Sequence, residues 1–188
     1  MNHWRAVVPF KLGGEAKSRL AGLLSAPERT ALSLRMANHV LSLLAASVRF
    51  AEIILLSPDR PNWWNGAWAA DLGAGLNAEL MAWRASQGDA PVLIIHTDLP
   101  LLEGVEVAAL LDAAEASGIA LATDRAGEGS NALAIADGRD LEFRFGSGSR
   151  ALHVAQAPAM PVINSLGLAA DLDTPDDAAF LAARGFTI

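Results

Sequence analysis

Short apolar runs alternate with stretches of helical periodicity along the whole chain, and this alternation constrains the fold more than any other feature. The clearest runs are EIILL, PVLII and IALA, at residues 52–56, 91–95 and 119–122. Apart from Glu52, each consists of apolar residues, which is typical of a strand buried on both faces of a parallel sheet. Stretches with apolar residues at helical spacing lie between or beside them, at residues 27–48, 76–86 and 105–116. The pattern therefore predicts an α/β fold with a mostly parallel sheet flanked by helices.

The remaining segments extend the same pattern to both ends of the chain. We predict further strands at residues 4–10, 132–136, 142–145 and 161–163. We predict further helices from near Lys17 and at residues 149–155 and 175–183. No repeat, low-complexity tract or linker divides the sequence, which favours a single domain spanning residues 1–188. In such folds, ligands bind at the carboxyl ends of the strands.

Composition excludes several classes of protein. With 52% hydrophobic residues and a mean hydropathy of +0.29, the chain is too apolar to be disordered. Its apolar runs are far shorter than the roughly 18 residues of a membrane span, and no signal peptide is evident, so we expect a cytoplasmic protein with no membrane partner. The lack of cysteine excludes a disulfide framework, a thiolate metal site and a cysteine nucleophile. A net charge of -7 argues against a nucleic-acid partner.

Acidic residues cluster at the edge of the sheet where ligands are expected. Asp98 and Asp124 come shortly after two of the buried strands, and Asp171 and Asp173 precede the last predicted helix. Carboxylate oxygens gathered in one place suit Mg²⁺, which takes one or two protein carboxylates together with substrate phosphates. Each residue also has a structural alternative, Asp98 as a turn residue and Asp173 with Thr174 as the cap of the last helix.

Three cations follow the first predicted strand. Lys11, Lys17 and Arg19 lie on one loop that also contains Gly13 and Gly14. In a protein of net negative charge, such a cluster indicates a polyphosphate, because a leaving pyrophosphate requires neutralisation. The alternative is a solvated basic loop with no ligand.

Two glycine-containing segments have the character of anion sites. FGSGS at residues 145–149 lies between a predicted strand and a predicted helix, and GEGSN at residues 127–131 follows a buried strand. Glycines allow close backbone approach, and a helix N-terminus offers donors to a phosphate. Neither segment has the lysine of a P-loop, and both have simple turns as the alternative.

Taken in order, these motifs resemble those of the CofC/FbiD guanylyltransferases of coenzyme F420 biosynthesis. The resemblance spans nearly the whole chain and rests on VPFK with AKSRL, DLPLL, DRAGEGSNAL, FGSGS followed by a histidine, and DLDTP. It implies a nucleotide-diphospho-sugar-transferase-like fold of the GT-A and Rossmann-like type. It also implies Mg²⁺-dependent transfer of GMP from GTP to 2-phospho-L-lactate, phosphoenolpyruvate or 3-phospho-D-glycerate, with release of pyrophosphate.

The resemblance also implies roles for individual residues. The two carboxylates expected to bind the metal are those of Asp98 and Asp173. Both residues, together with Lys17, are expected to be catalytic. The residues expected to bind the nucleotide are Lys11, Lys17, Arg19 and Asn77. The residues expected to bind the phosphate and carboxylate of the acceptor are Ser130, Gly146 and Ser149.

The chain departs from the family pattern at several positions. His96 and Thr97 stand where the family usually has Pro-Ala, Ser147 replaces a proline, and Arg150 replaces a phenylalanine. An Arg150 side chain that points toward the acceptor would favour an additional or more distant negative group. On this basis we expect 3-phospho-D-glycerate to be the preferred acceptor.

Other functions remain open at this point. A molybdenum-cofactor guanylyltransferase shares the fold and the donor, but its L-A-G-G loop is absent from this chain. A non-catalytic nucleotide-binding module of the same fold is a second alternative. One possible surface for a partner or a homodimer is formed by three tryptophans, Trp63, Trp64 and Trp68. The favoured interpretation is that these side chains are buried against the rest of the fold.

Overall fold

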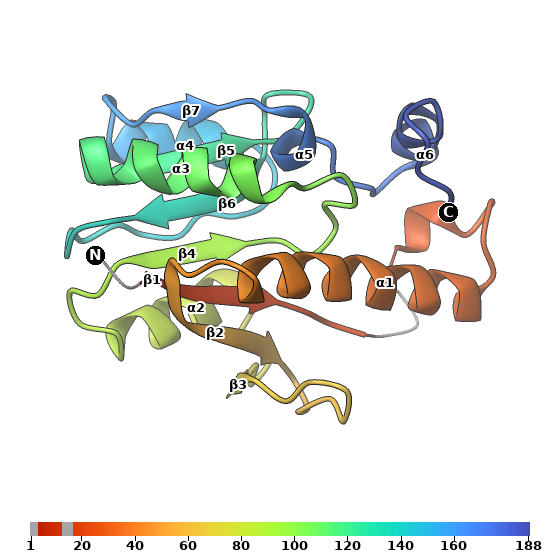
Figure 1. Cartoon of the computed structure of the whole chain (residues 1–188), viewed down its shortest axis with the longest axis horizontal. Coiled ribbons are helices and arrows are strands. Elements are labelled where there is room, and N and C mark those ends of the chain that lie inside the picture. Colours follow the sequence, from red (N-terminus) through yellow and green to blue (C-terminus); the bar gives the residue numbers. More distant parts are fainter. Residues whose placement is uncertain (1–3, 13–16) are drawn as a thin grey trace.

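The computed structural model describes residues 4–12 and 17–188, which form one seven-stranded sheet with helices on both faces (Figure 1). The strands follow the order β3-β2-β1-β4-β6-β5-β7 across the sheet. Their bounds are β1 Trp4–Pro9, β2 Phe50–Ser57, β3 Ala67–Ala70, β4 Val92–Ile95, β5 Ile119–Thr123, β6 Ser130–Ile135 and β7 Val162–Ile163. The helices are the 3-10 helix η1 Ser18–Leu20 and the α-helices α1 Ala26–Ala45, α2 Leu76–Ala85, α3 Gly104–Ser117, α4 Ser149–Gln156, α5 Leu166–Ala169 and α6 Pro175–Ala182. Gly13 and Gly14 lie outside the described residues.

The sheet is mostly parallel, as the alternation of strands and helices predicts. Strand β6 is the exception, because it runs antiparallel to both of its neighbours, β4 and β5. Its first residue, Ser130, consequently pairs with Thr123 at the carboxyl end of β5. The amino end of β6 thus joins the ligand-binding edge formed by the carboxyl ends of the parallel strands.

The uniformly apolar strands are explained by burial on both faces. Leu93 and Ile95 of β4 belong to a core cluster with Val40 of α1 and Leu110 of α3. The alternate residues of the same strand, including Ile94, pack in a second cluster that includes α2. The sheet therefore separates two cores, with α1 and α3 on one face and α2 on the other (Figure 1).

The strand predicted at residues 142–145 is wrong. The segment is extended and its apolar side chains point alternately inward, but it does not join the sheet. Its backbone N–H groups donate to side chains instead: Glu142 to Gln156 at 2.8 Å, Arg144 to His153 at 3.0 Å and Phe145 to Asn77 at 2.8 Å. Alternating hydrophobicity reports which side chains are buried, but not the partner of the backbone.

Two short elements, β3 and α5, were not expected from the sequence. Strand β3 lies at the edge of the sheet and follows the tryptophan-rich segment. Trp63 meets Phe10 edge-on with ring centroids 5.5 Å apart, and the indole N–H of Trp68 donates to the hydroxyl of Ser57. Trp63 and Trp64 pack half-buried against the core, as the favoured interpretation held. Within the described residues, no helix has the length and apolar character to span a membrane.

Candidate functional site

Asp98 and Asp173 are brought together by a backbone contact between their segments. Asp98 follows β4, and the buried Leu99 anchors the turn after it. The N–H of Leu172 donates to the carbonyl of Asp98 at 3.0 Å. Because Leu172 is itself fully buried, its neighbours Asp171 and Asp173 are held beside Asp98 at the sheet edge. The convergence of acidic residues that the sequence predicts is therefore present for these three residues.

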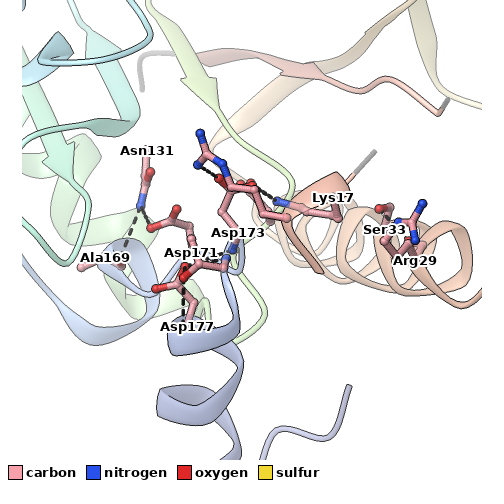
Figure 2. Close-up of polar contacts among 11 residues, drawn as sticks. Lys17, Arg29, Ser33, Asn131, Ala169, Asp171, Asp173 and Asp177 are labelled. Atoms are coloured by element: carbon pink, nitrogen blue, oxygen red, sulfur yellow. Dashed lines mark hydrogen bonds and ion pairs between the residues drawn. The ribbon is translucent and has the colours of Figure 1, made fainter. Parts of the chain in front are cut away.

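The basic loop meets this acidic cluster directly. The Lys17 Nζ lies 2.5 Å from Asp98 Oδ2 and 3.7 Å from Asp173 Oδ1. Arg19 Nη1 lies 2.5 Å from Asp173 Oδ2. Figure 2 shows Lys17 pointing into the acidic cluster from η1. Leu20 secures this position, since it packs with Leu172 in a third apolar cluster between α1 and α6.

Lys17 is held in an unusual backbone conformation. Its φ of 53° and ψ of 39° lie in the left-handed region, and no other non-glycine residue of the described chain has a positive φ. For an L-residue this conformation costs about 1–2 kcal/mol, which the surrounding contacts must offset. This backbone conformation directs the ammonium group of Lys17 toward two carboxylates.

Burial and neighbouring charges set the protonation of the cluster. Burial disfavours the charged form of Asp98, but the charges of Lys17 and His96 and the hydrogen bonds of the carboxylate together outweigh it and hold the pKa of this carboxyl below its usual value. Burial likewise opposes the charge of Lys17, yet Asp98 and Asp173 keep its pKa above the usual range. The pKa of Asp171 is raised to about 6 by burial and by the charge of Asp98. Asp98 is thus a charged carboxylate, whereas Asp171 takes up a proton more easily than an ordinary aspartate.

The donor set fits a magnesium ion. Asp98 and Asp173 already converge on one cation, the Lys17 ammonium, so both carboxylates are aimed at a common point. The second oxygen of Asp98, Oδ1, is buried and has no hydrogen-bond partner within residues 4–12 and 17–188. No group of three or more His, Cys, Asp or Glu side chains in the described chain forms a complete metal cage. Two carboxylates suffice for Mg²⁺ when substrate phosphates complete its coordination.

A cleft of about 340 Å³ opens beside Asp98 at the carboxyl ends of β1 and β4. Its lining includes Lys11, His96 and the backbone around Gly73 and Gly75. Asn77, which the resemblance assigns to the nucleotide, has both atoms of its amide bound to the backbone of Phe145, at 3.0 and 2.8 Å. The structure thus gives Asn77 a partner within the protein, and its contact with the nucleotide stays a prediction.

The three predicted acceptor residues gather around the start of α4. Ser130 and Ser149 are both almost fully buried, and Gly146 has a φ of 124°, which strongly favours glycine. The backbone N–H of Ser149 donates to the carbonyl of Gly146 at 3.2 Å. The hydroxyl of Ser149, rather than its N–H, is therefore the group that this residue can offer to an anion. Phe145 lies between His96 and His153, with ring centroids 5.3 and 5.0 Å away, so an aromatic row connects the cleft to this loop.

Comparisons with known proteins agree with this geometry. Residues 4–185 match the family described as "Guanylyl transferase CofC like". The chain is 39% identical to a phosphoenolpyruvate guanylyltransferase of Sphaerobacter thermophilus, over 95% of this chain and 92% of the relative. The chain belongs to the CofC-like guanylyltransferase family.

Two further relatives support the family and the fold. A phosphoenolpyruvate guanylyltransferase of Rubrobacter xylanophilus is 36% identical over 96% of this chain and 94% of the relative. A crystal structure from Desulfovibrio desulfuricans G20, provisionally classed as a nucleotide-diphospho-sugar transferase, superposes with a TM-score of 0.66 at 16% identity. It covers 93% of this chain and 84% of its own. The CofC-like match favours this family over the molybdenum-cofactor enzymes, and the expected nucleotide-diphospho-sugar-transferase-like fold is confirmed.

The structure removes the reason for preferring 3-phospho-D-glycerate in this member of the CofC-like family. Arg150 is exposed, and its guanidinium donates to the carbonyl of Gly127 at 2.8 Å. The side chain thus bridges two surface segments and does not point into the acceptor loop. The preference required an inward Arg150, so its basis is lost.

Two residues of the site lay outside the sequence-based assignments. Asn131 donates to the carbonyl of Leu168 at 3.0 Å and to Asp171 Oδ1 at 3.2 Å, linking β6 to the acidic segment. His153 is fully buried and bonds Ser130 and the backbone of Arg144, both at 3.0 Å. Asn131 directly follows Ser130 in its motif, and this adjacency was the available signal. For His153 the only signal was the histidine shared with the family.

Stability is expected to fall as the pH drops from 7 to 5, with His153 responsible for about 2 kcal/mol of the loss. Burial lowers the pKa of His153 to about 4, from an ordinary value of 6.5. Between these values the unfolded chain binds a proton at this residue and the folded chain does not, so acid favours unfolding. Asp171 acts in the opposite sense, because its raised pKa makes the folded state the better proton acceptor.

Urea unfolding of the wild type and of His153→Asn at pH 7 and pH 5, without divalent metal, isolates the contribution of His153. The contribution of Asp171 is common to both proteins and cancels in the comparison. We expect a smaller loss of stability in the variant. An equal loss in both proteins would contradict the assignment.

Proposed function

We propose that this protein transfers GMP from GTP to phosphoenolpyruvate with release of pyrophosphate, as a step in coenzyme F420 biosynthesis. The observation that carries the proposal is the convergence of Asp98 and Asp173 on Lys17, beside a cleft that Asp98 lines. Family membership supports guanylyl transfer, and the names of the two curated relatives favour phosphoenolpyruvate as the acceptor. We further propose that the protein acts in the cytoplasm. That it forms a homodimer stays a prediction.

The proposed reaction needs no dedicated base. A phosphate oxygen of the acceptor attacks the α-phosphorus of GTP, one new P–O bond forms, and the bond to the β-phosphate oxygen breaks. A phosphate monoester dianion carries no proton that must first be removed, so positioning and charge neutralisation supply the catalysis. This requirement agrees with a site that contains carboxylates, cations and hydroxyls within its described part.

The cations are proposed to bind the donor phosphates. Lys17 and Arg19 each contact a carboxylate in the ligand-free protein, and phosphate oxygens would compete for the same charges. Lys11 lines the neighbouring cleft, where the rest of the nucleotide has room. Asp98 and Asp173 would hold Mg²⁺, which when bound neutralises negative charge on the transferring phosphate and the leaving pyrophosphate.

The acceptor is proposed to bind at the loop before α4. Ser130 and Ser149 offer hydroxyl donors there. The space beside Gly146 is open to an anion, since no heavy atom other than those of Gly146 and its chain neighbours lies within 4 Å of the position a Cβ would occupy. Phosphoenolpyruvate carries a phosphate and a carboxylate, and both are acceptors for such donors.

Pyrophosphate release with GTP and Mg²⁺ tests the proposal. The protein is incubated separately with phosphoenolpyruvate, 2-phospho-L-lactate and 3-phospho-D-glycerate, and the guanylylated product is identified by mass spectrometry. We expect release with phosphoenolpyruvate to be fastest. Binding of GTP without turnover of any acid would instead identify a non-catalytic nucleotide-binding module.

Ser149→Ala is expected to weaken acceptor use by about tenfold to a hundredfold, because a hydroxyl donor to a charged group contributes about 1.5–3 kcal/mol. The Michaelis constant for phosphoenolpyruvate should rise while that for GTP stays within about twofold. Ser42→Ala, which removes the hydroxyl of an exposed serine in the last turn of α1, is the control. Equal changes in both Michaelis constants would argue against a role for Ser149 in acceptor binding.

A further inference from the structure

One buried imidazole bonds both Ser130 and the backbone of the loop that leads to Gly146. His153 lies in α4 and is fully buried. Its Nδ1 is 3.0 Å from the Oγ of Ser130, and its Nε2 is 3.0 Å from the backbone nitrogen of Arg144. Ser149 starts the same helix one turn earlier, and Gly146 lies two residues beyond Arg144. The ring therefore joins β6, the acceptor loop and α4.

The hydrogen-bond partners of the ring determine where its proton lies. A backbone N–H only donates, so Nε2 of His153 must accept from Arg144 and carry no hydrogen. A neutral imidazole then carries its hydrogen on Nδ1, and this N–H donates to Ser130 Oγ. A doubly protonated ring would direct an N–H against the N–H of Arg144. Burial also keeps the ring neutral, because it lowers the pKa of His153 to about 4.

This arrangement leaves the Ser130 hydroxyl with its own hydrogen unused. The Oγ of Ser130 accepts from His153, so its O–H must point to another acceptor. Among residues 4–12 and 17–188, no other side-chain hydrogen bond of Ser130 is present. Ser130 lies at the start of β6, on the edge of the sheet where the carboxyl ends of β4 and β5 also lie.

We infer that His153 is a positioning residue for the acceptor: it fixes the Ser130 hydroxyl as a hydrogen-bond donor toward an anionic oxygen and ties that donor to the loop before α4. The inference rests on the proposed function, since it takes the ligand at Ser130 to be the phosphorylated acid. A phosphate or carboxylate oxygen only accepts, so a hydroxyl locked as a donor discriminates in favour of an anion. His153 thereby acts on acceptor binding without touching the acceptor.

Two substitutions separate the two hydrogen bonds of the ring. The amide of His153→Asn can place an N–H near the position of Nδ1 and retain the bond to Ser130. The longer amide of His153→Gln can reach the Nε2 position, accept from Arg144, and leave Ser130 without its donor. We expect His153→Gln to raise the Michaelis constant for phosphoenolpyruvate about tenfold or more, and His153→Asn to restore most of that loss. The Michaelis constant for GTP and the kcat at saturating acceptor should change little in both variants.

A double-mutant cycle with Ser130→Ala tests whether His153 acts through Ser130. If it does, His153→Gln should add little to the effect of Ser130→Ala, because both changes remove the same interaction. Additive losses would overturn the inference, as would equal losses for His153→Asn and His153→Gln. Melting temperatures of all variants identify any that fail to fold. If His153→Gln fails to fold, Ser130→Ala together with His153→Asn still decides whether His153 acts through Ser130.

The tautomer provides a test that does not depend on activity. Nitrogen chemical shifts of the imidazoles in the ligand-free protein should show His153 with its hydrogen on Nδ1 at pH 7, and His153→Asn identifies its signals by their loss. A hydrogen on Nε2 would overturn the inference. A wild-type protein that turns over no acceptor would contradict the proposed function instead, whatever the tautomer proves to be.

Discussion

Asp98→Asn is expected to lower kcat for guanylyl transfer by about a hundredfold to a thousandfold, the effect of removing one group that stabilises charge in the transition state. The substitution preserves the shape of the side chain and removes its negative charge. Asp98 Oδ2 contacts Lys17 at 2.5 Å, and the buried Oδ1 has no partner in the described chain and is available to a metal ion. In the proposed function, loss of the charge would weaken Mg²⁺ binding and would also remove the ion pair with Lys17.

Initial rates at increasing Mg²⁺ concentration measure this effect. Partial recovery of the rate at high Mg²⁺ is expected if Asp98 binds the metal. Asp112→Asn is the matched control, because Asp112 is 65% exposed and pairs only at the surface with Arg49 at 2.7 Å. A rate close to that of the wild type in Asp98→Asn, with the same Mg²⁺ dependence, would remove Asp98 from the metal site.

Lys17→Ala is expected to reduce kcat/KM for GTP by about a hundredfold, with a much smaller effect on the Michaelis constant for the acceptor. Only 12% of the Lys17 side chain is exposed, and its ammonium lies within reach of Asp98 and Asp173. The Lys17 charge offsets the repulsion between the two carboxylates. In the proposed function, Mg²⁺ would take over this role and Lys17 would bind the phosphates of GTP.

Lys17→Gly separates the charge from the backbone strain. Glycine adopts the left-handed conformation at φ 53° without steric cost, whereas alanine does not. We expect both variants to lose the same activity, while Lys17→Gly unfolds at a higher temperature than Lys17→Ala. The control Arg60→Ala removes a surface cation that contacts the carbonyl of Gly66. Equal losses in the use of GTP and of acceptor would indicate a general structural role for Lys17.

Most strands and helices follow from local patterns of hydrophobicity. The apolar run at residues 91–95 predicts a strand that the structure places at Val92–Ile95, and the helix expected at 76–86 is found at Leu76–Ala85. Because an apolar run ends where the chain leaves the core, the run before Asp98 also locates this carboxylate at the edge of the sheet. Local periodicity carries this information because it depends only on which faces are buried.

The partners of the side chains depend on contacts between distant segments. Lys17 and Asp98 are 81 positions apart, and Arg19 and Asp173 are 154 apart, yet each pair forms an ion pair. The packing of Leu20 with Leu172 brings the segments that form these ion pairs together. A local sequence pattern does not predict a contact between segments so far apart in the chain. The same holds for residues 142–145, whose alternation is that of a strand but whose backbone bonds to Asn77, His153 and Gln156.

The sequence alone was sufficient to name Asp98, Asp173, Lys17 and Arg19 as candidate residues and to place the carboxylates at one edge of the sheet, because strand ends and motif order are local properties. Tertiary structure was required to reveal which partners these and the other candidate side chains bond. The tertiary structure places Arg150 at the surface. It also forms the hydrogen bonds of Asn77 to the backbone of Phe145 and of His153 to Ser130. The physical reason is that a polar side chain bonds the nearest partner that packing presents, and packing is set by apolar residues far away in the chain.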